Sequence, residues 1–186
     1  MKISVLDLRS ECGEIHAYVL AAGIIIVLVT AFLGMAEITS VDAAHNQVAR
    51  ALQASLRGAA RMQDFQQEGR ILPAVAHNGF ETLLAANLAL AQAGHDGNTL
   101  LLRPTGRHPY ISGTAKADFD IRNNGNGDTL IARVRVPLRL PFIGPTFQRI
   151  YGHEVTVCEA LAVTPHDLLS GFTVDNSIPI PAGWGC

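Results

Sequence analysis

The chain has 186 residues, of which 48% are hydrophobic and only 16% charged, and its formal net charge is −2. This length suits one domain with an anchor or a tail and is short for two domains. Nucleic-acid binding calls for a basic surface, which this balance of charge does not support, so no nucleic-acid partner is expected.

The first element is an apolar stretch over residues 17–36, which contains no charged residue and no proline. About 20 apolar residues match the hydrocarbon thickness of a bilayer. The alternative is a secretory signal, whose apolar region is shorter and ends in a small-x-small cleavage site such as Gly34-Met35-Ala36. We expect a retained transmembrane helix over 17–36 behind a cytoplasmic leader, residues 1–16, with cleavage after Ala36 as the alternative.

The basic residues near this stretch predict its orientation. Lys2 and Arg9 precede it, whereas the first basic residue after it is Arg50. The positive-inside rule counts Lys and Arg near the ends of a span. The N-terminus is therefore expected in the cytoplasm, and the bulk of the chain outside it, anchored in the cell membrane by a single pass.

The stretch runs on into an amphipathic segment that ends near residue 67. Good helix formers dominate it, and no proline occurs before Pro73. We expect one continuous helix over residues 15–67, roughly 75–80 Å long. Its apolar positions keep helical spacing: Ile38, Val41, Ala44, Val48, Leu52, Ala59 and Met62.

A second helix is expected over residues 80–93. Asn78 followed by Glu81 resembles a capping box, and Gly94 supplies a stop. An apolar stripe runs along the segment: Phe80, Leu83, Leu84, Leu88 and Ala91.

The apolar period then changes from helical spacing to two. Residues 111–121 and 130–140 alternate apolar and polar side chains, which predicts two half-buried strands. The segment NNGNGD at 123–128 predicts the hairpin turn between them. A third strand is expected over 154–163, and Pro137 indicates that its own strand lies at an edge, ends or bulges there.

These elements predict an α+β fold, in which a small antiparallel sheet is covered by the amphipathic half of the long helix. The domain spans residues 37–163, and residues 164–186 form an irregular tail rich in Pro and Gly. Six residues are expected to form the core between helix and sheet: Val41, Val48, Leu52, Phe119, Val134 and Val136.

The sequence shows no pattern typical of a catalytic site, so neither an enzyme, nor a cofactor, nor a small-molecule substrate is expected. HEVTV begins like a zinc-binding HExxH motif, but residue 157 is valine, and His153 and Cys158 would point to opposite faces of a strand. DIRNNGNGD resembles a calcium loop only in passing. Arg133 and Arg135 fit either an anionic partner or a solvated strand face.

Three segments carry a resemblance to a known family. They are RSECGEIHAYVLAAGIIIVLVTAFLGMAE at the start, GDTLIARVRVPLRLPFIGP in the middle and HEVTVCEALAV at 153–163. With this ground plan the chain resembles type IV pilin-like proteins, most of all the TadE/TadG-like minor pseudopilins of tight-adherence pili. The resemblance implies a structural pilus or secretion component whose partners are the membrane, other pilins and pilus-assembly proteins. A membrane-anchored binding domain that does not assemble is the alternative.

The leader departs from the pilin pattern at its processing site. Prepilins are cut after a glycine that is followed, five residues on, by glutamate. Here Gly13 is followed at that place by Tyr18, whereas Glu14 comes first. Gly13 and Glu14 are therefore the candidate processing residues of a leader that lacks the full motif.

The three cysteines, Cys12, Cys158 and Cys186, form no CxxC pair. Cys158 and Cys186 both follow the apolar stretch, on the side expected to be oxidising, and a disulfide between them would tie down the tail. Disulfides that join the C-terminal segment to the sheet also occur in type IV pilin-like proteins. The alternative is a buried Cys158 and a free thiol at Cys186.

Overall fold

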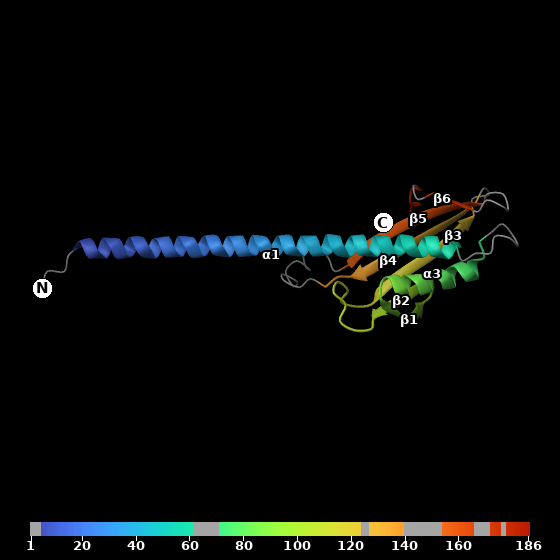
Figure 1. Ribbon diagram of the computed structural model, residues 1–186, viewed down its shortest axis with the longest axis horizontal. Helices are drawn as coiled ribbons and strands as arrows, with labels where there is room; N and C mark the ends of the chain where they lie inside the picture. The colour runs from blue at the N-terminus through green and yellow to red at the C-terminus, as the bar shows by residue number, and fades with distance from the viewer. Residues whose placement is uncertain (1–4, 62–70, 124–126, 140–153, 166–171, 176–177) are drawn as a thin grey trace.

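The computed structural model describes residues 5–61, 71–123, 127–139, 154–165, 172–175 and 178–186, with side chains from residue 16 onward in the long helix. It consists of one very long helix whose C-terminal half packs, together with a shorter helix, on an antiparallel sheet (Figure 1). The fold class is therefore the expected α+β, with a long apolar helix as its first element.

Helix α1 runs without a break from Val5 to Arg61. It begins ten residues before the expected start at residue 15, so the leader is helical from Val5 and the backbone does not change at the start of the apolar stretch. The expected end at residue 67 lies outside the described residues. At 1.5 Å per residue the described helix is about 85 Å long, and half of it extends beyond the domain (Figure 1).

Helix α3, Pro73–Asn87, differs from the expected helix at both ends. It begins at a proline, whose fixed φ and missing N–H suit the first turn, so Asn78 lies inside the helix and caps nothing. It ends because Ala89 takes a left-handed conformation with φ of 52°. Gly94, the expected stop, has φ of 117° and lies at an irregularity in the strand that follows.

Six strands form a meander in which every neighbour in sequence is also a neighbour in the sheet. All adjacent pairs are antiparallel. In chain order they are β1 (Leu90–Asp96), β2 (Thr99–Pro104), β3 (Ala115–Asn123), β4 (Asp128–Pro137), β5 (Glu154–Pro165) and β6 (Phe172–Asp175).

The three expected strands correspond to β3, β4 and β5, and the other three strands were not predicted. Strand β3 begins at Ala115, while Ile111 makes only an isolated bridge to Leu138 beyond the end of β4. Pro137 is the last residue of β4, a strand in the middle of the sheet, so it marks an end rather than an edge. The tail that was expected to be irregular contains β6.

The hydrophobic core lies between the two helices and one face of the sheet. Helix α1 packs most extensively against α3, and among the strands it contacts mainly β5 and also β4, while α3 also contacts β1. The rings of Phe80 in α3 and Phe119 in β3 stack with centroids 4.5 Å apart. All six expected core residues lie in this core, five of them buried and Val41 partly buried at its margin.

Candidate functional site

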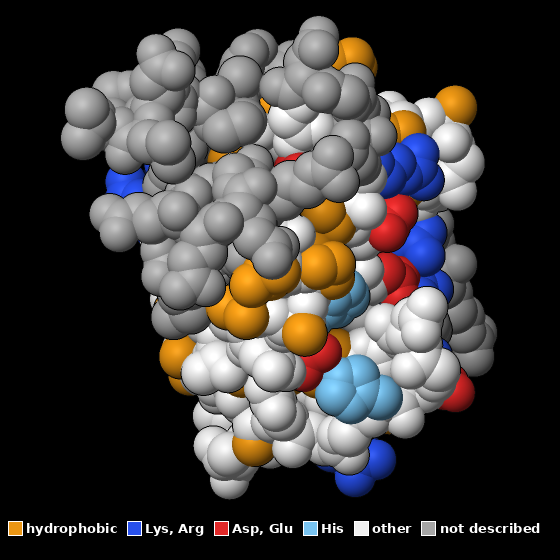
Figure 2. Space-filling view, turned by 90° about the vertical axis from the view of Figure 1, so that its right-hand side faces the viewer, with side chains coloured by type: hydrophobic (Ala, Val, Ile, Leu, Met, Phe, Trp, Pro, Cys, Tyr) orange, Lys and Arg blue, Asp and Glu red, His pale blue; other side chains and the backbone are white. Residues whose placement is uncertain are grey.

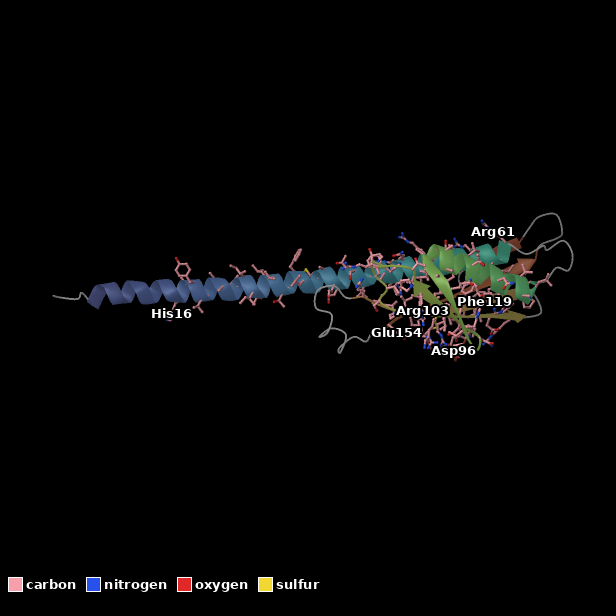
Figure 3. The ribbon with its side chains drawn as sticks, turned by 90° about the horizontal axis from the view of Figure 1, so that it is seen from below. His16, Arg61, Asp96, Arg103, Phe119 and Glu154 are labelled. Atoms are coloured by element: carbon pink, nitrogen blue, oxygen red, sulfur yellow. A yellow bond between two sulfur atoms is a disulfide. The ribbon has the colours of Figure 1, made fainter. Side chains whose placement is uncertain are left out.

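The most unusual surface of the described chain is the N-terminal half of α1. Except for Leu33, its large apolar side chains are more than half exposed, and they project on all sides of the helix (Figure 3). This exposed apolar half, defined here as residues 17–36, contains the following strongly exposed members: Tyr18, Val19, Leu20, Ile24, Ile25, Ile26, Val27, Leu28, Val29, Phe32 and Met35. Exposed apolar surface of this extent indicates a surface that is covered in the functional state.

One segment among the described residues is long and apolar enough to cross a membrane, and it lies in α1 near the N-terminus, with a mean hydropathy of 2.7. Apart from Tyr18, the exposed apolar half has one residue with a hydroxyl group, Thr30, and this hydroxyl forms a hydrogen bond within the helix. Thr30 Oγ1 donates to the carbonyl oxygen of Ile26 at 2.8 Å, one turn back. An internal partner of this kind lowers the cost of placing a hydroxyl in hydrocarbon.

The exposure of α1 changes gradually between Leu33, which is already partly covered, and Ala44, which is buried. Glu37, the first charged residue after the exposed apolar half, is only 1% exposed, whereas Ile38 is 56% exposed. The periodicity that placed Ile38 on the core side is therefore wrong at this position, because Glu37, and not Ile38, lies on the buried side of the helix with Ala44 and Val48. From Ala44 onward the expected apolar positions are buried: Ala44, Val48, Leu52 and Ala59.

The candidate processing residues, Gly13 and Glu14, both lie within the helical backbone of α1. The helix runs past them and past Tyr18 without interruption. Both residues are therefore located within α1, and cleavage after Gly13 stays a prediction.

The outer face of the sheet, opposite the helices, has a row of polar side chains that crosses four strands. The register places Thr99 opposite Asp118, Asp118 opposite Arg133, and Arg133 opposite Cys158. Asp118 accepts hydrogen bonds from Thr99 Oγ1 at 2.6 Å and from Arg133 Nε and Nη2 at 2.9 and 2.7 Å. Arg135 Nη2 reaches the same carboxylate at 3.3 Å.

The electrostatics of this row favour an ionised Asp118. Burial raises the pKa of the carboxyl group, but the hydrogen bonds from Thr99 and Arg133 and the charges of Arg133 and Arg135 lower it by more. The pKa of Asp118 therefore lies below its ordinary value. Arg133 and Arg135, for which the sequence left an external anion and a solvated face as alternatives, both form an ion pair with Asp118.

The C-terminal tail lies on this same outer face. Cys186 is bonded to Cys158, with Cα atoms 6.2 Å apart, which is the pair expected from the sequence. Arg133 donates from Nη1 to the carbonyl oxygen of Trp184, and its guanidinium lies 5.8 Å from the centroid of the indole ring. The tail is thus fixed to both β4 and β5.

Within the part of the chain that the structure describes, no group of three or more His, Cys, Asp or Glu side chains could hold a metal ion. His153 lies outside the described residues. Of the segment considered as a calcium loop, Ile121 and Arg122 belong to β3, and Asp120 accepts hydrogen bonds from the Ile121 backbone and the Arg122 side chain.

At the end of the domain farthest from the N-terminus, acidic and basic side chains are intermixed along one side (Figure 2).

The sequence analysis did not predict the polar row, although it placed three of the row's residues on the polar face of their strands. The alternation in β3 and β4 put Asp118, Arg133 and Arg135 on the polar face, but which carboxylate meets which guanidinium depends on register. Thr99 belongs to a strand that was not predicted.

Comparison with known proteins adds no identification: no family model, no curated protein and no solved structure matches the chain.

Proposed function

We propose that the chain is a structural subunit of the pilin type, a minor component of a tight-adherence pilus or a related secretion system. The observation that carries the proposal is the contrast within α1. One half is apolar on every side and exposed, and the other half, in the same unbroken helix, forms the core of an α+β domain.

This contrast suits a subunit that is used in two environments. A helix that is apolar all round is compatible with lipid, and it is equally compatible with the helices of neighbouring subunits. The rigid continuation into the domain would fix the position of each domain relative to its own anchor. A mobile linker between anchor and domain would be sufficient for a simple tether, and α1 has none from Val5 to Arg61.

In this proposal the N-terminus lies in the cytoplasm, and the domain lies outside the cell membrane. That orientation is supported by Lys2 and Arg9 before the apolar half and by the disulfide on the other side, since disulfides persist in oxidising compartments. The domain acts by packing with other pilins and assembly proteins, not as an enzyme, and needs no cofactor or small-molecule substrate.

A second candidate function is a single-pass anchored domain that never assembles into filaments. The observation that favours it is Tyr18, which stands where the pilin pattern has glutamate. In this case the exposed apolar half would contact lipid alone throughout the life of the protein.

Site-specific photo-crosslinking in the producing cell separates the two functions. A photoreactive amino acid replaces Ile25, on the exposed apolar half, and, as the matched control, Arg50, on the exposed side of the second half. For a pilin-type subunit, position 25 forms adducts with other pilin-like chains, and these disappear when the assembly ATPase is deleted. Adducts with lipid only would establish the anchored domain instead.

The mature N-terminus, measured by mass spectrometry of the membrane-bound protein, tests processing. A terminus at Glu14 would support pilin-type cleavage after Gly13. A terminus at Glu37 would show that the apolar half is a signal peptide, and it would end both candidate functions.

A further inference from the structure

The end of the domain nearest the exposed apolar half contains an open hollow of about 570 Å³. It is formed by the segment between β2 and β3 and by the residues just after β4, and Arg107, His108, Ser112 and Arg139 are among those that line it. The same segments are fixed to each other by backbone hydrogen bonds. Arg139 N donates to Tyr110 O at 2.7 Å, and Ser112 N donates to Pro137 O at 2.9 Å.

This hollow lies at the level of the helix where the domain begins. His108, Tyr110 and Leu138 contact the same small apolar cavity as Ala44 and Val48 of α1. From there the sheet extends away from the exposed apolar half, since Gln53 reaches Glu159 farther along both elements. In Figure 3, Arg103 at the end of β2 and Glu154 at the start of β5 mark this near end, and Arg61 marks the far end of α1.

The side chains of the hollow suit an anion. Arg107 and Arg139 are exposed, and neither forms a salt bridge with any described residue. His108 Nδ1 accepts from the backbone N–H groups of Tyr110 and Ile111 at 3.3 and 3.1 Å. The neutral ring then has its proton on Nε2, which makes His108 a further donor. No carboxylate is among the lining residues, while Glu154 at the start of β5 and the exposed Asp42 of α1 are acidic residues near this end of the domain.

The distance to a bilayer suits an anionic headgroup. Ala44 lies eight residues beyond Ala36, the last residue of the exposed apolar half, which is about 12 Å along a helix. The polar headgroup region accounts for about 5–8 Å of this on each side of a bilayer. The distance that remains between the headgroup region and the level of Ala44 is shorter than the electrostatic screening length of about 8 Å at physiological salt. The two arginine side chains shorten this distance further.

We infer that Arg107, Arg139 and His108 form a docking site for the anionic phospholipid headgroups of the bilayer in which α1 is inserted. The inference rests on the proposed membrane insertion of α1 and adds a contact between the domain and the lipid surface. Such a contact would hold the domain in one orientation against the membrane before any assembly with partners. Each arginine beside an anionic leaflet is expected to favour docking by a factor of about five.

Hydrogen–deuterium exchange of the full chain in nanodiscs tests the inference. The nanodiscs contain phosphatidylcholine alone or phosphatidylcholine mixed with phosphatidylglycerol. Amide exchange in residues 104–112 should slow in the anionic nanodiscs, and the double variant R107A/R139A should lose most of this slowing. The matched control R61A/R122A removes the same charge at the far end of the domain and should behave as the wild type.

Three results would overturn the inference. The first is equal exchange in both kinds of nanodisc, and the second is undiminished slowing in R107A/R139A. The third is slowing by added inorganic phosphate in phosphatidylcholine nanodiscs, which would make the hollow a site for free anions. Retention of the protein in phosphatidylcholine nanodiscs is scored separately. If the chain is not retained there, the insertion of α1 and the docking site both fail, whereas retention without slowing ends the docking site alone.

Discussion

The two halves of α1 share one backbone geometry and differ in everything around it. Residues 17–36 expose large apolar side chains on all sides, whereas in the second half Val48, Leu52 and Leu56 are at most 3% exposed and the opposite side is polar. The comparison teaches that helix formation and burial are separate properties of this chain. Good helix formers dominate the second half, whereas residues 24–30 of the first half are mostly β-branched and poorer helix formers, yet the helix continues through both. Only the second half has a sheet to cover its apolar stripe.

The largest expected effect is on the buried half. Leu52→Ala should lower the free energy of unfolding by about 2–5 kcal/mol, because Leu52 is fully buried and the change leaves a cavity. Ile25→Ala, in the exposed apolar half, should leave that value unchanged. Denaturant unfolding of the detergent-solubilised chain measures both, with Arg50→Ala as a surface control expected within about 0.5 kcal/mol of the wild type. Equal effects at Leu52 and Ile25 would abolish the distinction between the halves.

The second effect concerns the tail, which the domain holds and the exposed apolar half does not touch. Cys186→Ser should lower the free energy of unfolding by about 3–4 kcal/mol, since the disulfide closes a loop with a sequence separation of 28. Thiol counting on the denatured wild type, purified without reductant, should find one free thiol, that of Cys12. Three free thiols would show that the bond does not form in the cell, and Cys12→Ser serves as the silent control.

A charge placed in each half gives the third effect. Val27→Arg should oppose membrane insertion by about 2.5–3.5 kcal/mol, the cost of arginine near the centre of a span. Ala54→Arg adds the same charge on the exposed side of the second half and should insert normally. Carbonate extraction of membranes measures the fraction inserted, and extraction of both variants to the same degree would contradict the assignment of the halves.

The smallest effect is at the polar row and depends on pH. Asp118→Asn should lower the free energy of unfolding at neutral pH by about 1.5–3 kcal/mol, because charge-assisted hydrogen bonds are lost. The pKa of Asp118 is lowered in the folded chain, so its stabilisation is complete above the unfolded pKa and disappears as the pH falls through the folded value. The variant and the wild type should therefore converge in acid.

Urea unfolding from neutral pH down to strongly acidic pH follows this convergence. Asp120→Asn, whose partner Arg122 is nearly half exposed, is the control and should change stability by about 0–1 kcal/mol at any pH. A constant gap between Asp118→Asn and the wild type across the whole pH range would refute an ionised Asp118 as the source of the stabilisation.

The parts of the fold that the sequence predicted are those with strong periodicity. The alternation in β3 and β4 and the helical spacing from Val41 to Ala59 correctly placed the core, because one face of each element is buried against another. The pairing of Cys158 with Cys186 was predicted from their position after the apolar stretch, from the need to tie down the tail and from the resemblance to pilin-like proteins. The alternation in the strands and the spacing in the helix are local patterns, so they can be identified without knowing which elements lie beside them.

The missed parts depended on features that local patterns do not contain. Residues 90–93 are Leu-Ala-Gln-Ala, good helix formers that the structure uses in β1, because Ala89 turns the chain first. The sequence did contain one unused signal. Gly97-Asn98, between Asp96 and Thr99, is a two-residue hairpin turn, and it would have predicted β1 and β2. The polar row required the register between strands.

The order of the strands also has a consequence for synthesis. Besides α3, which follows it in the chain, α1 is covered by β5, whose Leu161 and Val163 come about 110 residues after Leu52. At about 5–20 residues per second, translation takes roughly 5–20 s to reach them. During this interval the second half of α1 has left the ribosome without the strand that covers it in the finished fold. Substitutions that delay the pairing of β4 with β5 therefore prolong this exposure, and they reduce the yield of protein before they alter its stability.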